Sequence, residues 1–186
     1  MGKIILITGG ARSGKSKFAE KITKGTGNKI TYIATAIPFD EGMKDRIKKH
    51  KESRPQEWNT IEKYKDFKKL DKDENFIKAD TVLLDCITLM VTNILMDSGL
   101  DFDKCSMEEI DKVEDEVFYE VKGLIKIARE YNKNLVFVTN EVGMGLVPPY
   151  RFGNIFRDIA GRVNQYLASE AEEVYFTVSG IPMKIK

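Results

Sequence analysis

The sequence predicts an α/β fold in which a mostly parallel β-sheet lies between two layers of helices. Short apolar runs typical of strands alternate along the chain with longer segments that have helical periodicity. One of these runs is hydrophobic without interruption, as expected of a strand buried on both faces of a parallel sheet. Strands that alternate with helices form βαβ units, whose helices cover both faces of the sheet.

The expected elements can be placed from the N-terminus onwards. Five apolar runs are predicted to be strands: 3–8, 29–34, 79–85, 135–139 and 173–178. Three periodic segments are predicted to be helices: 16–24, 107–131 and 151–171. The charged stretch Asp40–Glu57 is expected to form a helix and loop that cover part of the molecule. Ser179–Pro182 is typical of a turn and leads into a short last strand, Met183–Ile185, expected to be antiparallel at the edge of the sheet.

Composition narrows the class of protein. The 186 residues are 42% hydrophobic and 32% charged, which predicts one globular domain spanning 1–186. The formal net charge of +1 gives no overall basic excess that would point to nucleic acid. The most apolar stretch, Val82–Met96, contains polar residues and is too short for a membrane span. Cys86 and Cys105 form no CxxC pair, so we expect free thiols and a cytoplasmic protein without stable membrane insertion.

The strongest motif lies directly after the first predicted strand. The residues from Gly9 onwards read G-G-A-R-S-G-K-S and match the phosphate-loop pattern G-x-x-x-x-G-K-[ST]. In such a P-loop, backbone N–H groups surround the phosphates, and the helix that follows directs its positive end at them. We expect Lys15 to reach the β- and γ-phosphates and Ser16 to bind Mg²⁺. The alternative is a glycine turn that only links strand to helix. The expected nucleotide-binding residues here are Gly9, Gly10, Ala11, Arg12, Ser13, Gly14, Lys15 and Ser16.

Two more predicted strands end in polar residues. The run Val82–Asp85 ends in a carboxylate where a P-loop fold needs an acid near Mg²⁺, so we expect Asp85 to bind the ion, partly through water. Thr139–Glu141 ends another strand and is expected either to contact a substrate or to cap the sheet. Together these features predict a P-loop NTPase fold of the RecA-like kind. This is a three-layer α/β sandwich with a mostly parallel sheet and an antiparallel C-terminal edge strand.

His50 is the single histidine and lies in a cationic segment, R-I-K-K-H-K-E-S-R-P. A lone histidine among charges is usually a solvated surface residue. However, a polyphosphate site requires cationic neighbours, and such neighbours also favour the neutral, nucleophilic imidazole. A covalent phosphoramidate on His50 is therefore one hypothesis, and a solvated surface residue is the other.

Nearly end to end, the sequence resembles the bifunctional adenosylcobinamide kinase / adenosylcobinamide-phosphate guanylyltransferase family of cobalamin biosynthesis. The segment R-I-x-x-H-x-x-x-R-P around His50 carries this resemblance far more specifically than the P-loop does. The other stretches that carry it are 32–36, 58–62, 85–88, 91–93, 138–143 and 156–165. At position 85 the chain has Asp where the family usually has Glu, and Gly42 likewise stands where Glu is usual.

The resemblance implies two successive reactions in a homotrimer. First, ATP or GTP phosphorylates the aminopropanol hydroxyl of adenosylcobinamide. A histidine, by position His50, then attacks the α-phosphate of GTP, releases pyrophosphate and holds GMP. The cobinamide phosphate takes up this GMP to give adenosylcobinamide-GDP. Beyond the P-loop, the nucleotide contacts that the resemblance implies are Ala34, Thr35, Ala36, Lys51, Glu52, Ser53, Arg54, Glu62 and Asp85.

Other classes of protein share the P-loop and remain as alternatives. A GTPase switch or an ATPase would need a residue that positions water and would have no small-molecule acceptor. A kinase of a different metabolite would perform only one of the two reactions. A nucleotide-binding regulator would leave GTP unchanged.

Overall fold

The computed structural model describes residues 2–38 and 40–186, apart from the side chains of Arg46 and Ser53. Within these residues, seven strands form one sheet in the order β3-β2-β4-β5-β1-β6-β7. Neighbouring strands are parallel throughout, except that β6 and β7 are antiparallel. The strands are β1 (Ile4–Gly9), β2 (Ile30–Ala34), β3 (Asn59–Glu62), β4 (Thr81–Asp85), β5 (Asn134–Val138), β6 (Glu173–Val178) and β7 (Ile181–Lys184).

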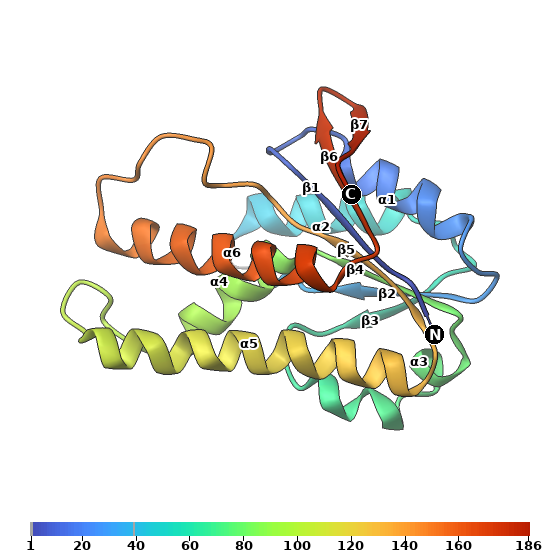
Figure 1. Ribbon diagram of the computed structural model, residues 1–186, viewed down its shortest axis with the longest axis horizontal. Coiled ribbons are helices and arrows are strands. Elements are labelled where there is room, and N and C mark those ends of the chain that lie inside the picture. Colours follow the sequence, from blue (N-terminus) through green and yellow to red (C-terminus); the bar gives the residue numbers. More distant parts are fainter. Residues whose placement is uncertain (1, 39) are drawn as a thin grey trace.

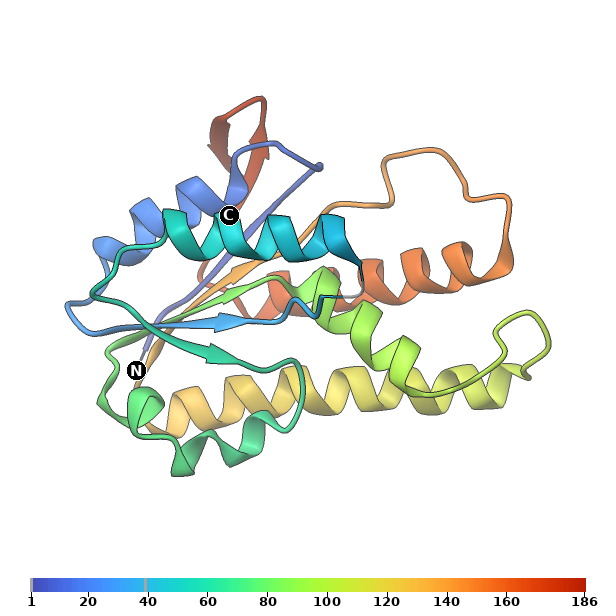
Figure 2. The ribbon, with the colours of Figure 1, turned by 180° about the vertical axis from the view of Figure 1, so that it is seen from behind.

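Helices cover both faces of the sheet (Figures 1 and 2). One face carries α1 (Lys15–Lys24) and α2 (Glu41–Ser53). The opposite face carries α4 (Ile87–Asp97), α5 (Met107–Glu130) and α6 (Arg151–Glu170), together with the short helices η1 (Phe67–Lys72) and α3 (Glu74–Lys78). The predicted P-loop NTPase sandwich with its antiparallel C-terminal edge strand is thereby confirmed. No helix in the described part of the chain combines the length and the apolar character needed to cross a membrane.

The apolar core has a part on each face because side chains alternate along the strands. In β1, Ile4 and Leu6 belong to the larger cluster, under α4, α5 and α6. Ile5 and Ile7 belong to the smaller cluster, which lies under α1. All four side chains are at most 3% exposed, as expected of a central strand with helices on both sides.

The order of the strands positions the candidate site. Strand β5 lies between β1, which leads into the P-loop, and β4, which ends in Asp85. In a parallel sheet the carboxyl ends of the strands share one edge, and ligands bind in the crevice outside it. The P-loop, Asp85 and the residues after Val138 therefore meet at this edge.

Strand β3 and helix α4 were not predicted from the sequence, and the last strand begins earlier than predicted. Strand β3 has a single buried residue, Ile61, so it shows no apolar run. Helix α4 is apolar almost all round and lacks the one-sided pattern of a surface helix. Ser179 and Gly180 both have positive φ, 50° and 82°, and form a two-residue hairpin turn by themselves. The predicted turn was therefore two residues too long, and β7 begins at Ile181.

Candidate nucleotide site

The P-loop lies between β1 and α1 and needs glycine at two positions. Gly14 precedes α1 with φ of 94°, a left-handed conformation that favours glycine. A Cβ on Gly9 would lie 2.3 Å from the carbonyl oxygen of Thr177 in β6. The amide of Gly180, in the β6–β7 turn, donates a hydrogen bond of 2.8 Å to the carbonyl of Ser13. The β6–β7 hairpin thus lies against the P-loop and supports it, as the adjacent ribbons in Figure 1 show.

The start of α1 is arranged to receive an anion. Its first turn contains no acidic residue, and no side chain caps its N-terminal amides. Such amides and the helix dipole attract phosphate. Lys15 is 7% exposed, and its ammonium group donates to the carbonyl of Gly10 at 2.6 Å. The charge needed to neutralise a polyphosphate therefore lies inside the loop.

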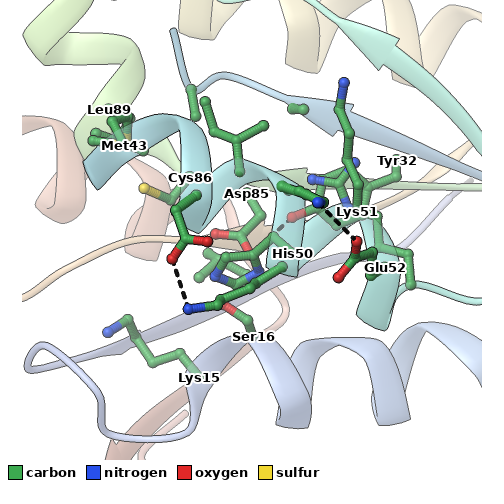
Figure 3. Close-up of a pocket in the computed structure, with 18 of the residues that line it drawn as sticks. Lys15, Ser16, Tyr32, Met43, His50, Lys51, Glu52, Asp85, Cys86 and Leu89 are labelled. Atoms are coloured by element: carbon green, nitrogen blue, oxygen red, sulfur yellow. Dashed lines mark hydrogen bonds and ion pairs between the residues drawn. The ribbon is translucent and has the colours of Figure 1, made fainter. Parts of the chain in front are cut away.

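One cavity of about 1000 Å³ lies between the P-loop, the edge of the sheet and α2. Figure 3 shows Lys15 and Ser16 at the start of α1, His50 and Lys51 on α2, and Asp85 at the end of β4. The predicted site residues that line this cavity are Ala11, Arg12, Ser13, Gly14, Lys15, Ser16, Ala34, Ala36, His50, Lys51, Glu52, Arg54, Glu62 and Asp85. The fold thus brings the P-loop and the histidine segment, more than thirty residues apart in sequence, to one space.

Four predicted nucleotide-binding residues do not line the cavity or cannot be placed. Gly9, the last residue of β1, and Gly10, directly after it, are not among the residues that line the cavity. Thr35 is 1% exposed, and its hydroxyl exchanges hydrogen bonds with the N–H and C=O of Cys86, at 2.9 and 2.7 Å. It joins the end of β2 to the end of β4. The side chain of Ser53 lies outside the described residues.

Helix α2 is held differently from the rest of the site. Asp40 caps its start by accepting a hydrogen bond of 2.6 Å from the amide of Met43. None of the α2 side chains that the structure describes is buried. Its lysines form exposed ion pairs, which contribute little to stability. These pairs are Lys44–Glu41, Lys48–Glu52, Lys49–Asp45 and Lys51–Glu62. A bound polyphosphate would have to compete with these carboxylates for the lysines.

Tyr32 is a cavity residue that the sequence analysis did not identify. It is 3% exposed in β2, and its hydroxyl donates to Oδ2 of Asp85 at 3.0 Å. The guanidinium of Arg54, directly after α2, lies 3.7 Å from the centre of its ring. Burial, followed by the nearby charge of Asp85, raises the pKa of Tyr32 well above 10. The one available signal was a polar aromatic residue near the carboxyl end of a predicted inner strand.

Glu20 is a further carboxylate that the sequence analysis did not identify, and it does not itself line the cavity. This residue of α1 is half-buried. Burial and the charge of Asp85 raise its pKa, whereas the charge of His50 lowers it. Glu20 therefore lies within electrostatic range of both groups. Glu20 belongs to no motif, so the sequence pattern gave no sign of this.

Cys86 follows Asp85 and also lines the cavity. Burial, with Asp85 as the next cause, raises the pKa of its thiol to about 12. A thiol is a nucleophile only as thiolate, so Cys86 is inert at neutral pH. The imidazole of His50 is the better nucleophile of the two. Cys86 and Cys105 are both free, as predicted.

A buried polar network fixes the end of β5. The hydroxyl of Thr139 donates to Oδ1 of Asn164 at 2.7 Å, and the amide of Asn164 donates to the carbonyl of Asn140 at 3.1 Å. The backbone N–H of Asn140 donates to the hydroxyl of Thr88 at 2.7 Å. Thr139 therefore ties β5 to α4 and α6, while Asn140 lines the cavity. Thr139 thus caps the sheet, which was one alternative for this segment, and contact of Asn140 with a substrate stays a prediction.

The oxygen donors of the cavity are compatible with magnesium. Mg²⁺ prefers hard oxygen ligands and usually keeps several waters, so one or two protein oxygens beside phosphates suffice. Ser16 and Asp85 are both half-buried and line the same cavity. Among the described residues there is no group of three or more His, Cys, Asp or Glu side chains that could hold a metal alone. Magnesium would therefore arrive with the nucleotide.

Sequence comparisons agree with this geometry. Residues 5–185 match the family described as cobinamide kinase / cobinamide phosphate guanyltransferase. The chain is 45% identical to the bifunctional adenosylcobalamin biosynthesis protein CobU of Escherichia coli K12, over 98% of this chain and 99% of that protein. It is 44% identical to CobU of Salmonella typhimurium LT2, with the same coverage. The CobP protein of Pseudomonas aeruginosa PAO1 is 35% identical, over 97% of this chain and 96% of its own. The chain belongs to the cobinamide kinase / cobinamide phosphate guanyltransferase family.

Proposed function

We propose that the protein is a bifunctional enzyme of cobalamin biosynthesis. It phosphorylates adenosylcobinamide with ATP or GTP and then transfers GMP from GTP to the product, giving adenosylcobinamide-GDP. The observation that carries this proposal is the single cavity lined by both Lys15 of the P-loop and His50 of α2. A kinase alone would need the P-loop, whereas the second reaction also needs a nucleophile further along the polyphosphate.

The kinase step uses the P-loop wall of the cavity. The acceptor hydroxyl loses its proton and attacks the γ-phosphorus, the bond to the β-phosphate breaks, and the nucleoside diphosphate leaves. Lys15 and the amides at the start of α1 stabilise the charge on the equatorial and leaving oxygens. When bound, Mg²⁺ would neutralise part of the phosphate charge, and Ser16 and Asp85 would hold it.

The GMP-transfer step uses the α2 wall. A ring nitrogen of His50 attacks the α-phosphorus of GTP, and the bond to the β-phosphate breaks so that pyrophosphate leaves. An oxygen of the cobinamide phosphate then attacks the same phosphorus, and the P–N bond breaks to restore the imidazole. Lys51, Glu52, Arg54 and Glu62 would contact the nucleotide from this side, since all four line the cavity.

We also propose a homotrimer, as the family resemblance implies. Exposed apolar side chains support further assembly, because isolated soluble chains rarely gather them on one segment. Met144, Leu146, Val147 and Tyr150 lie in the loop before α6 and are between 59% and 95% exposed. Light scattering with size-exclusion chromatography measures the mass directly, and a monomer at micromolar concentration would contradict this part.

The experiment follows two labels through both reactions. Adenosylcobinamide is incubated with the protein, Mg²⁺ and GTP labelled either at the γ- or at the α-phosphorus. The proposal expects the γ-label first in cobinamide phosphate and the α-label then in the GDP derivative. Release of inorganic phosphate without any labelled corrinoid would favour a GTPase switch. Labelled corrinoid phosphate without the second product would favour a kinase alone, and unchanged GTP would favour a regulator.

A further inference from the structure

We propose that Tyr32 is a positioning residue for GMP transfer: its ring orients Arg54 towards the phosphates of GTP, and its hydroxyl orients Asp85. This inference rests on the function proposed above and names a residue beyond the expected nucleotide contacts. Tyr32 connects the segment that carries His50 to the strand that carries Asp85. It would thus set the position of both polar groups relative to one nucleotide.

The ring of Tyr32 is a fixed surface. It is 3% exposed in β2, an inner strand paired on both sides. Its neighbours in the smaller core cluster include Trp58 and Leu83. Arg54 lies over the ring with Cζ 3.7 Å from its centre, well inside the roughly 6 Å range of cation–π attraction. Because α2 buries none of its described side chains, this contact with the core anchors its C-terminal end.

Arg54 carries hydrogen-bond donors that the described residues do not use. Its Nε and Nη1 atoms are buried, and neither has a partner in the part of the chain that the structure describes. Buried charged donors without acceptors are costly and rare, so such groups call for a ligand or water. A guanidinium presents its donors as a planar fork, which fits phosphate oxygens. The Arg54 side chain lines the cavity, so a bound polyphosphate can supply these oxygens.

The P-loop on one side of the cavity and α2 on the other indicate which phosphate Arg54 would contact. The P-loop takes the β- and γ-phosphates through Lys15. Arg54 lies four residues beyond His50, which must reach the α-phosphorus to form the GMP adduct. Arg54 is therefore placed to stabilise charge at the α-phosphate as the pyrophosphate bond breaks. Stacking on Tyr32 restricts the guanidinium to one plane and so lowers the entropy lost when it binds.

The hydroxyl of Tyr32 acts on the other polar group. It donates to Oδ2 of Asp85 at 3.0 Å and thereby fixes the orientation of this carboxylate at the edge of the cavity. The two functions of Tyr32 can be separated by mutation, because phenylalanine keeps the ring and loses only the hydroxyl.

The test measures single-turnover formation of the protein–GMP adduct from α-labelled GTP, as the maximal rate constant and the half-saturating GTP concentration. Tyr32→Leu should lower the maximal rate constant about tenfold or more, the upper range of a desolvated cation–π contact. Tyr32→Phe should lower the maximal rate constant less, by about threefold, since it keeps the stacked ring and loses only the hydrogen bond to Asp85. Arg54→Ala should lower the maximal rate constant by at least as much as Tyr32→Leu. The double variant Tyr32→Leu/Arg54→Ala should be no slower than Arg54→Ala alone, because both substitutions remove the same stacked contact.

A matched control lies on the opposite face of the sheet. Tyr119 of α5 is 54% exposed and has Nζ of Lys68 3.6 Å from its ring centre, a similar contact far from the cavity. Tyr119→Leu should leave adduct formation unchanged. If Tyr32→Leu is unfolded at the assay temperature, Arg54→Lys decides, because lysine keeps the charge but not the stacked fork. It should lower the maximal rate constant about tenfold.

Several results would overturn the inference. These are a wild-type rate constant for folded Tyr32→Leu or for Arg54→Lys, or a double variant that shows the product of both single losses. An effect confined to thermal stability would make Tyr32 a packing residue only. Failure of the underlying function looks different, because wild-type protein would then form no adduct at all.

Discussion

The two walls of the cavity are held in place by different forces. The P-loop is built into the core, because β1 is a central strand, Lys15 is 7% exposed and the β6–β7 turn bonds to Ser13. Helix α2 instead lies on the surface with exposed ion pairs, and Arg54, directly after it, stacks on Tyr32. Elements with few buried contacts open and move most easily. A fixed wall for phosphate binding faces a wall that is expected to move more easily and that carries the proposed nucleophile, His50, which suits two reactions on one nucleotide.

Removal of the nucleophile should have the largest and most selective effect. His50→Ala is expected to abolish the covalent GMP adduct, because one step alone uses the imidazole. Phosphorylation of cobinamide should stay within about threefold of wild type, since the P-loop wall is unchanged. Both are measured with α- and γ-labelled GTP in parallel. A labelled His50→Ala chain would show that another residue is the nucleophile.

Removal of the lysine of the P-loop should impair the kinase reaction. Lys15→Ala is expected to lower the kinase rate constant by about 10²-fold or more, as when one contact to transition-state charge is lost. Lys21→Ala is the matched control, because Lys21 belongs to the same helix but is exposed and outside the cavity. Steady-state kinetics with ATP and cobinamide measure both variants. Equal rates for Lys15→Ala and Lys21→Ala would contradict the role of the P-loop.

Hydrogen exchange should report the difference in mobility between the walls. Amides of α2 are expected to exchange about tenfold faster or more than those of α1, because α2 buries no described side chain whereas α1 buries Ala19 and Thr23. GTP with Mg²⁺ should slow exchange in α2 more than in α1. Mass spectrometry of peptic peptides measures both. Equal protection of α1 and α2 without nucleotide would contradict the comparison.

The smallest expected effect lies far from both walls, at the opposite edge of the sheet. Glu173 begins β6, pairs with Lys3 and Lys184, and accepts a hydrogen bond of 2.6 Å from Tyr175. These contacts lower its pKa from 4.5 to about 2. The ionised group therefore stabilises the fold above pH 4.5, and this contribution is lost as the pH falls from 4.5 towards 2.

Glu173→Gln should accordingly lower the free energy of unfolding by about 1–2 kcal/mol at neutral pH. The difference from wild type should shrink as the pH falls through the same window. Both activities should be unchanged, because Glu173 does not line the cavity. Urea unfolding at several pH values measures the effect. A difference that is constant from pH 7 to pH 2 would contradict the assigned cause.

The sequence predicted the fixed wall better than the movable one. Regular patterns produce regular structure, so the strand before Gly9, the helix predicted from Ser16 and the acid at Asp85 could all be placed. The contact between Tyr32 and Arg54 could not be predicted, since it depends on where a surface helix folds back over the sheet. Glu20 was missed for the same reason, because its distance from His50 is set by packing between α1 and α2 and by no local pattern.

The intact mass of the wild-type chain after incubation with GTP and Mg²⁺ tests the central claim most directly. If the P-loop and α2 form one site for both reactions, the chain should gain the mass of one GMP, with the modification on the peptide that contains His50. Incubation with ATP under the same conditions shows whether the modification depends on the guanine base. An unmodified chain, or GMP attached to a residue outside this cavity, would contradict the account.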